Sequence, residues 1–180
     1  MKKIIVIILT LFLVSGCIKK DLASDVVKAY LNNYVNLTSD VKESLNKTIS
    51  ENNEFSDLNK KMYKKILLRQ YKDLKYTILT EEYDRDKALI TVNINVYDLN
   101  KADEAATNYL STNLKEFYDN DDKFNNDKYI NYKLNLMYES KDRVDYNIVF
   151  FLNKKKNKWV LEQPTDSDLE KIHGIYKSNN

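Results

Sequence analysis

Cys17 is the residue whose type and position most directly suggest chemistry. It is the only cysteine in the 180-residue chain, and it directly follows Val14, Ser15 and Gly16. A lone cysteine has no disulfide partner in its own chain, so in an oxidising compartment it would be an unpaired reactive thiol. The residues around Cys17 therefore decide how this thiol is interpreted.

The residues before Cys17 have the layout of a secretory signal. Lys2 and Lys3 give a positive start, residues 4–14 are apolar apart from Thr10, and small residues follow. The apolar run is too short to cross a bilayer as a helix, which takes about 20 residues. A positive start, a short apolar core and small residues at its end are typical of a secretory signal peptide.

Val14-Ser15-Gly16-Cys17 resembles the bacterial lipobox. The resemblance implies that the thiol of Cys17 receives a diacylglyceryl group and that the signal, residues 1–16, is cut off just before it. The new amino terminus is often acylated as well, with fatty acids such as palmitate. Two or more acyl chains hold a protein stably at a membrane, whereas one does so only marginally. Residues 17–21 would then be a short lipidated tether; the alternative is an ordinary signal peptide that contains a cysteine by chance.

The charge balance excludes several classes of function. The chain has 29 Lys and Arg and 27 Asp and Glu; removing Lys2 and Lys3 with the signal leaves 27 of each. A net charge of zero argues against binding to nucleic acid, which needs a basic surface. It also argues against strong attraction to anionic lipid. The richness in Lys, Asn, Ile and Tyr favours an AT-rich, low-GC Gram-positive genome.

Scarce residue types exclude further classes. Gly174 is the only glycine left after the signal, so the glycine-rich loops that bind phosphates and dinucleotides are excluded. His173 is the only histidine, and without a second histidine or cysteine the usual zinc sites are excluded too. A triad would need His173 itself as its base. We favour a surface or helix-end histidine, because no partner residue is identifiable, and we expect no cofactor and no metal.

Two acidic features have both a catalytic and a structural interpretation. Asp98 continues the alternation of the preceding strand, so it could be a pocket acid whose raised pKa lets it act as a base. The favoured alternative is that Asp98 or Asn100 caps a helix beginning near Lys101. The segment DNDDKFNND, residues 119–127, has several carboxylates that could bind calcium. Phe124, however, replaces the glycine of an EF-hand loop. A solvated helix-to-strand loop fits it better.

The chain has 14 tyrosines, and some of them fall on expected inward faces. They could line a pocket with hydroxyls aimed at a polar ligand, or simply pack in the core. These candidates are Tyr30, Tyr34, Tyr132 and Tyr146, with Asp98 at the pocket mouth. A second set falls on the opposite faces and predicts an apolar partner patch on the outer sheet surface, unless a helix covers it. This set is Tyr97, Met137, Val149 and Phe151.

The hydrophobic periods predict helices first and strands later. Apolar residues at helical spacing predict three helices. The first has a stripe from Val26 to Val35 with Ser24 or Asp21 as its cap. The second runs from Asp40 to about 50 with an Asp40–Glu43 capping pair, and the third from Ser56 to about 74 with Leu58 facing inward. Alternation predicts a hairpin of residues 75–83 and 88–97, and a fourth helix follows from about Asn100. A second hairpin, 130–138 with 144–152, and a last strand, 158–163, bring the total to five strands, with a helical turn near Leu169.

This order predicts an α+β fold, in which N-terminal helices pack on an antiparallel sheet with one helix between two hairpins. Residues 76–99 and 158–168, YTILTEEYDRDKALITVNINVYDL and KWVLEQPTDSD, resemble small bacterial lipoproteins with a nuclear transport factor 2-like domain. The resemblance covers about residues 22–176 and implies a curved sheet that wraps a long helix into a cone with an apolar pocket. We expect residues 22–180 to form one domain.

Members of that superfamily serve as binding modules or as enzymes, so the fold does not settle the function. We expect a non-catalytic binding module, lipid-anchored outside the cytoplasm, for a protein partner or a small ligand. The alternatives are a small pocket enzyme that uses an acid such as Asp98, and a structural component of an envelope complex.

Overall fold

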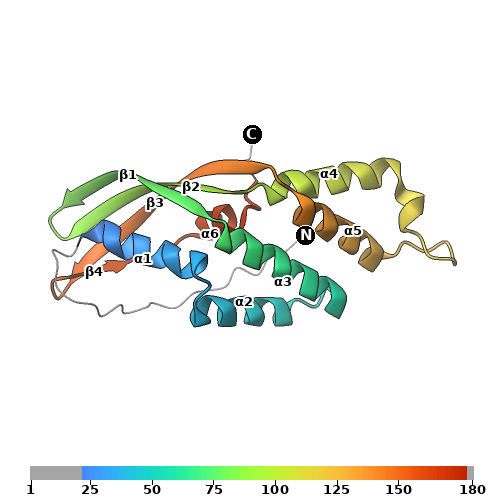
Figure 1. The fold of residues 1–180 in the computed structure, drawn as a ribbon, viewed down its shortest axis with the longest axis horizontal. Coiled ribbons are helices and arrows are strands. Elements are labelled where there is room, and N and C mark those ends of the chain that lie inside the picture. Colours follow the sequence, from blue (N-terminus) through green and yellow to red (C-terminus); the bar gives the residue numbers. More distant parts are fainter. Residues whose placement is uncertain (1–21, 178–180) are drawn as a thin grey trace.

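The structure is a computed structural model that describes residues 22–177. Three helices come first, followed by a hairpin, two further helices, a second hairpin and a last helix (Figure 1). The helices are α1 (Ala23–Val35), α2 (Ser39–Glu51), α3 (Asp57–Lys72), α4 (Leu99–Thr112), α5 (Asn126–Glu139) and α6 (Asp166–His173), with the short 3-10 helix η1 (Leu114–Phe117) after α4. The strands are β1 (Lys75–Asp84), β2 (Lys87–Tyr97), β3 (Arg143–Lys155) and β4 (Lys158–Leu161). The predicted α+β class is confirmed.

The four strands form one antiparallel sheet in the order β1-β2-β3-β4. Its central strand β2 confirms the predicted alternation, because every second residue from Ala88 to Val96 is buried. The expected hairpin of β1 and β2 is present, whereas the expected hairpin of 130–138 with 144–152 is not. Strand β3 instead forms its hairpin with β4, and in that turn Lys156 and Asn157 have positive φ angles of 50° and 63°. Two such residues make the turn whose twist matches that of the flanking strands.

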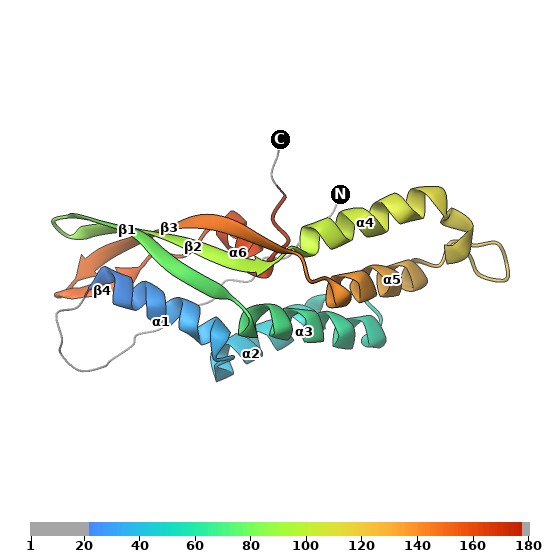
Figure 2. The same cartoon turned by 45° about the horizontal axis from the view of Figure 1, so that its top comes forward.

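The main core lies on the inner face of the sheet. Helix α1 runs along this face (Figures 1 and 2), and its Val27 and Leu31 are fully buried. They belong to one cluster with Ile90 and Val92 of β2 and Phe150 of β3. Burying side chains of this size contributes about 1.5–3 kcal/mol each, so this cluster accounts for much of the stability of the sheet. We call the four strands with α1 and α6 the sheet half.

Helices α4 and α5 extend away from the sheet, toward the end of the molecule opposite the two hairpin turns (Figure 2). With η1 they form what we call the helical half, which packs on α3. Ile66 of α3 meets Leu99 and Ala102 of α4 and Ile130 and Leu134 of α5 in a second buried cluster. None of the helices within residues 22–177 has the length and apolar character of a membrane span.

The prediction of a strand at 130–138 is wrong, because these residues belong to α5. Ile130, Leu134 and Met137 are buried, and their spacing of four and three residues is that of one helix face. The side chain of Asn125 caps the helix by accepting from the backbone N of Lys128 at 2.9 Å. The described part of the sheet therefore has four strands instead of five, and two helices with η1, instead of one helix, separate the hairpins.

Several helix ends differ from the expected positions by a residue or more. Ser56 caps α3 as predicted, accepting from the backbone N of Asn59. Helix α2 begins at Ser39, so Asp40 lies inside its first turn instead of capping it. Leu58, expected to face inward, is 64% exposed because it sits in the first turn of α3, away from the second cluster. The last helix is longer than one turn, and Thr165 and Asp168 form a capping box at its N-terminus.

Gln70 and Gly174 join the two halves. The buried amide of Gln70 pairs with both backbone groups of Tyr97, donating to its O at 3.1 Å and accepting from its N at 3.0 Å. The carbonyl of Gly174 accepts from the backbone N atoms of Leu99 and Asn100 at 2.9 and 3.0 Å. Gly174 has a φ of 70°, and a Cβ there would lie 2.1 Å from the O of Tyr97. Only glycine fits this position.

Two arginines complete the junction. The guanidinium carbons of Arg69 and Arg143 lie 3.8 and 4.6 Å from the ring centre of Tyr97. Arg69 also donates to the carbonyls of Tyr138 and Ser140 at the end of α5. Carbonyls at a helix end have no partner inside the helix, so a cation there is favourable. Arg69 thus connects the end of α5 to the last residue of β2.

Candidate functional site

A cavity of about 460 Å³ lies between the helices and is the leading candidate site. All six α-helices contribute side chains to its lining, together with the segment that joins α2 to α3. Its volume falls within the range of sites that hold small molecules. The residues that line it divide into an aromatic group and a charged group, and the two groups can make different contacts with a ligand.

The aromatic group contains Tyr34, Tyr71 and His173, together with Phe55 and Tyr63. Tyr34 and Tyr71 meet edge to face with ring centres 5.1 Å apart, and the ring of His173 lies 5.6 Å from that of Tyr71. Phe55 and Tyr63 make a similar edge-to-face pair at 5.4 Å. Such contacts hold the rings in place, so the wall they form is preorganised for a flat or apolar ligand.

The ionisable aromatic groups of this wall are neutral near pH 7. Burial lowers the pKa of His173 to about 4, and it raises the pKa of Tyr63 to about 12. Burial, with smaller contributions from Tyr34 and Tyr63, raises the pKa of Tyr71 well above its ordinary value. These side chains can therefore donate and accept hydrogen bonds or pack against a ligand, but they bring no charge to it.

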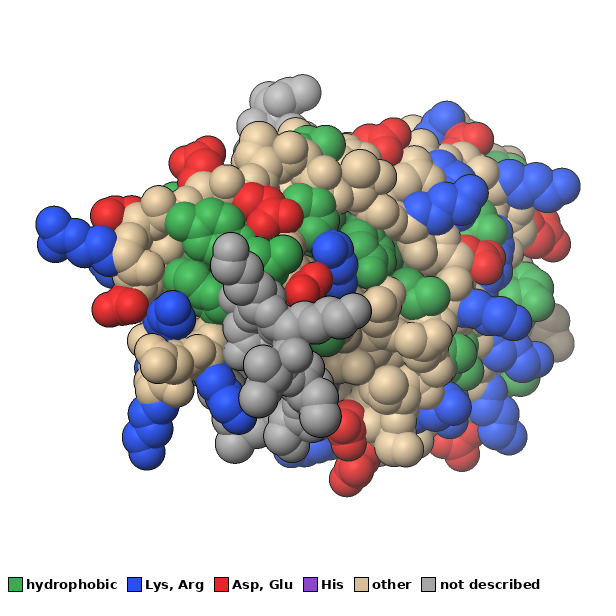
Figure 3. Space-filling view, turned by 60° about the vertical axis from the view of Figure 1, so that its left-hand side comes forward, with side chains coloured by type: hydrophobic (Ala, Val, Ile, Leu, Met, Phe, Trp, Pro, Cys, Tyr) green, Lys and Arg blue, Asp and Glu red, His purple; other side chains and the backbone are tan. Residues whose placement is uncertain are grey.

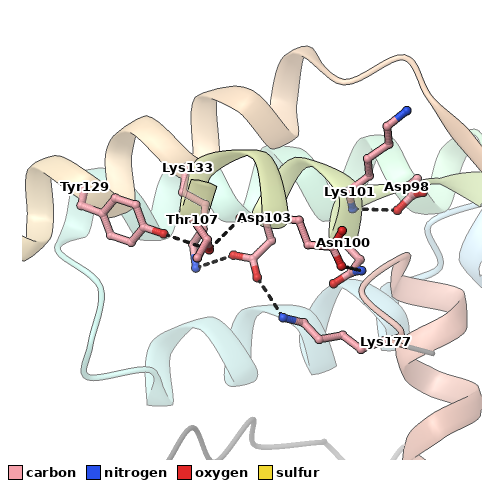
Figure 4. Close-up of polar contacts among 9 residues, drawn as sticks. Asp98, Asn100, Lys101, Asp103, Thr107, Tyr129, Lys133 and Lys177 are labelled. Atoms are coloured by element: carbon pink, nitrogen blue, oxygen red, sulfur yellow. Dashed lines mark hydrogen bonds and ion pairs between the residues drawn. The ribbon is translucent and has the colours of Figure 1, made fainter. Parts of the chain in front are cut away.

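The charged group is centred on Asp103 of α4 (Figure 4). The carboxylate of Asp103 lies 3.0 Å from Nζ of Lys133 on α5. It also lies 3.3 Å from Nζ of Lys177, a residue in the segment after α6. Burial by itself would raise the pKa of Asp103, but hydrogen bonds and attraction from the two lysines outweigh it, so the pKa is lowered. Two ammonium groups share this carboxylate. Glu51, Glu54 and Glu170 also line the cavity, so the lining as a whole has more carboxylates than ammonium groups.

Asn100 adds a hydrogen-bond acceptor next to this group. Its Nδ2 donates to the carboxylate of Glu104 at 2.8 Å, which orients the amide. Its Oδ1 is buried, and within residues 22–177 no donor reaches it. A buried acceptor without a partner costs free energy, so a donor supplied by a ligand or by water would be favourable here.

The structure divides the five predicted pocket residues among separate places. Tyr30 and Tyr34 come together, with hydroxyls 3.1 Å apart, but only Tyr34 lines the cavity. Tyr132 stacks on Tyr109 in the helical half at 4.9 Å, and Tyr146 meets Tyr176 at 5.6 Å. Asp98 caps α4, accepting from the backbone N of Lys101 at 2.9 Å, and is not part of the cavity wall.

Sequence reasoning missed most residues of the cavity. Tyr63 and Tyr71 lie on the inward face of α3, and this helical spacing was a usable signal. Nothing in the sequence indicated that Asp103 and Lys133 would pair, because only the packing of α5 on α4 brings them together. His173 is at a helix end, as expected, but its ring turns inward onto Tyr71 and lines the cavity instead of the surface.

The expected outer patch is only partly present. Val149 and Phe151 are 41% and 52% exposed on the outer face of β3, opposite Thr91 and Leu89 of β2. Tyr97 is covered by the two arginines. Met137 is buried in the second cluster, because its segment is a helix and not a strand.

The acidic segment 119–127 joins η1 to α5, so it is a helix-to-helix connection and not the expected helix-to-strand loop. Asn125 Nδ2 donates to the carboxylate of Asp119 at 2.8 Å, which ties the two ends of the loop together. Within residues 22–177 no three His, Cys, Asp or Glu side chains are grouped as a metal site would need.

Comparison with known proteins finds no match: no protein-family model, no curated protein and no solved structure resembles the chain closely enough. The cavity therefore has to be interpreted from its own chemistry. That chemistry is an ordered, neutral aromatic wall beside the ion pairs of Asp103 with two lysines, a free acceptor and further carboxylates. A molecule with an apolar body and a polar head fits both groups.

Proposed function

We propose that the chain is a lipid-anchored, extracytoplasmic binding module that holds a small amphipathic ligand in the cavity between its helices. The observation that carries the proposal is the pairing of two unlike surfaces in one cavity. The neutral rings of Tyr34, Tyr71 and His173 can pack against the apolar body of a ligand. Lys133 and Lys177 can donate hydrogen bonds to its polar head. Small-molecule sites commonly combine an apolar lining with a few such polar groups.

The membrane anchor in this proposal rests on Val14, Ser15, Gly16 and Cys17, which lie outside the described residues. A lipidated Cys17 would place the cavity outside the cytoplasm, where it could meet solutes. Cys17→Ser should leave the chain uncleaved or released from the membrane, since no thioether to diacylglycerol can form. If the variant still partitions fully into detergent after processing, the anchor assignment is wrong.

We extend the proposal to a nuclear transport factor 2-like architecture, a curved sheet wrapped around a helix. Two observations support it. Helix α1 lies along the inner face of an antiparallel sheet, and β1 carries a register shift between Ile78 and Thr80 that bends a strand. In this chain the cavity opens between the helices and not against the middle of the sheet.

The enzyme alternative based on Asp98 has less support. Its carboxylate accepts a backbone hydrogen bond at the start of α4, and the cavity lies elsewhere. As a binding module, the protein should retain ligand binding after Asp98→Asn, because the amide oxygen can still cap the helix.

Native mass spectrometry of the full chain in detergent tests the binding proposal. We expect an extra mass that disappears on denaturation and that is lost in Ser44→Trp, because Ser44 lines the cavity and an indole there would fill it. Ser50→Trp is the matched control, since Ser50 lies on the same helix but is exposed. An adduct retained in Ser44→Trp, or lost equally in both variants, would contradict a site in this cavity. No adduct at all would favour a protein partner, to be sought by crosslinking on intact cells.

A further inference from the structure

The two ends of the molecule differ sharply in charge. The turn between β3 and β4 carries Lys154, Lys155, Lys156 and Lys158 and no acidic residue from Asn153 to Lys158. At the opposite end, the connection before α5 contains Asp119, Asp121 and Asp122 against one lysine, Lys123 (Figure 1). A net charge near zero for the whole chain therefore conceals a basic end and an acidic end.

The neighbouring turn does not cancel these lysines. Between β1 and β2 the charged residues are Asp84, Arg85, Asp86 and Lys87, two of each sign. The turns are joined by a hydrogen bond from the backbone N of Lys154 to the O of Asp86 at 2.7 Å. Within the two turns the four positive charges of the second one remain, and the carboxylates beside the turns are those of Glu81, Glu82 and Glu162.

The chain enters the described fold at this same basic end. Helix α1 packs on β4, and its first residues lie beside the hairpin turns in both ribbon views (Figures 1 and 2). Five residue steps separate Cys17 from Leu22, and an extended chain covers at most about 18 Å in that length. A lipid on Cys17 would therefore hold the basic end, and not the acidic one, near the membrane surface.

Amphipathic side chains accompany the lysines there. The rings of Tyr83 and Trp159 lie 5.7 Å apart, and Lys154 Nζ lies 5.6 Å from the Trp159 ring. Leu22 and Phe151 are 42% and 52% exposed. Figure 3 brings this end forward and shows hydrophobic side chains gathered among charged ones. Tryptophan and tyrosine are the residues enriched at the level of lipid headgroups.

We propose that the β3–β4 turn docks on anionic lipid headgroups and holds the anchored protein with its acidic end pointing away from the membrane. The proposal rests on the lipid anchor proposed above. Polybasic segments next to an anchor gain affinity from the negative surface potential of a membrane, within about one Debye length. The lysines and the anchor act together, because a short tether keeps the turn within that distance.

Trp159 makes the docking measurable, because it is the only tryptophan in the chain. The full chain is reconstituted into phosphatidylcholine vesicles with and without phosphatidylglycerol, both containing headgroup-labelled quencher lipid. We expect quenching of Trp159 to be about twofold stronger with phosphatidylglycerol, and the gain to vanish at high salt, since screening weakens surface attraction.

Two variants with the same change in charge separate docking from general attraction. The first variant replaces the four lysines of the turn by Gln: Lys154, Lys155, Lys156 and Lys158. The second replaces four exposed lysines away from the turn by Gln: Lys115, Lys123, Lys128 and Lys141. We expect the first variant to lose the gain in quenching and the second to keep it. Equal loss in both variants, or no gain in the unmodified chain, would overturn the docking.

Flotation with the neutral vesicles separates this proposal from the one on which it rests. A chain that floats with phosphatidylcholine vesicles but shows no gain with phosphatidylglycerol is anchored without docking, which overturns only the second proposal. A chain that fails to float with neutral vesicles has no lipid anchor, which overturns the first and removes the basis of the second.

Discussion

Strand β2 and helix α5 carry nearly the same alternation of apolar and polar residues, yet one lies in the sheet half and the other in the helical half. In β2 every second side chain from Ala88 to Val96 is buried. In α5 the buried side chains are Ile130, Leu134 and Met137, at helical spacing. Alternation alone therefore does not decide between strand and helix.

The residue types separate the two segments better than their pattern does. The inward residues of β2 are mostly Ile and Val, which are stiff at χ1 and pack well on a pleated surface. Helix α5 buries Leu134 and Met137, which lose little freedom in a helix, beside a single Ile, and Asn125 caps it. The following predictions test how far the two halves differ and how firmly they are joined.

Gly174→Ala should have the largest effect, because Gly174 joins the two halves. A Cβ there would lie 2.1 Å from the O of Tyr97 and 2.2 Å from Nε2 of Gln70, and the backbone is left-handed. We expect a loss of about 5 kcal/mol or more in the free energy of unfolding, measured by urea denaturation. Asn157→Ala is the control, with a similar φ of 63° at an exposed turn, and should cost only about 1 kcal/mol. Similar losses in the two variants would show that Gly174 is not a packing constraint.

Leu31→Ala and Leu134→Ala apply one change to the two cores. Leu31 is fully buried in the sheet half and Leu134 is 1% exposed in the helical half. Each should cost about 3 kcal/mol, from lost burial and the cavity left behind.

Circular dichroism reports all helices, whereas Trp159 fluorescence reports the sheet half. If the two signals change together in urea for Leu134→Ala, the halves unfold as one unit; separate transitions would show that the helical half unfolds alone.

The pH dependence of stability tests the cavity wall where the two halves meet. The pKa of His173 is about 4 in the folded chain, below the ordinary value of about 6.5 expected when unfolded. The unfolded chain therefore binds more protons between these values, and the free energy of unfolding falls as the pH falls through that window. Lowering the pH from 7 to 5 should cost about 2 kcal/mol on this account.

His173→Phe keeps a ring against Tyr71 but removes the titrating group. Its urea midpoint should change less between pH 7 and pH 5 than that of the unmodified chain. An unchanged pH dependence in this variant would mean that His173 is protonated as easily in the folded state as in the unfolded one.

Asp98→Ala should have the smallest of these effects and should act only on the start of the helical half. It removes the acceptor that caps α4, at a cost of about 1 kcal/mol. Asp98→Asn retains an acceptor and should be nearly neutral. Urea denaturation of both variants measures the difference, and a loss as large in Asp98→Asn as in Asp98→Ala would point to a role for the carboxylate charge beyond capping.

The cavity shows how little of a site can be predicted when its parts come from different helices. Tyr34 was identified because it shares the inward face of α1 with other apolar residues. Asp103 and Lys133 were not, because they lie on helices separated by a polar loop, and one of those helices was expected to be a strand. The ion pair between them exists only where α5 packs on α4.

Features that depend only on neighbouring residues could be predicted before the fold was known. The α+β class, the first three helices, the hairpin of β1 and β2, the turn at Lys156 and the cap at Asp98 all follow from local periods, turn residues and caps. Long-range packing sets the rest: that residues 130–138 form a helix, that His173 points inward and which side chains surround the cavity. Burial and ion pairing depend on which elements meet in space. A segment whose apolar residues fit both a helical and a strand period therefore adopts the one whose apolar face its neighbours can cover.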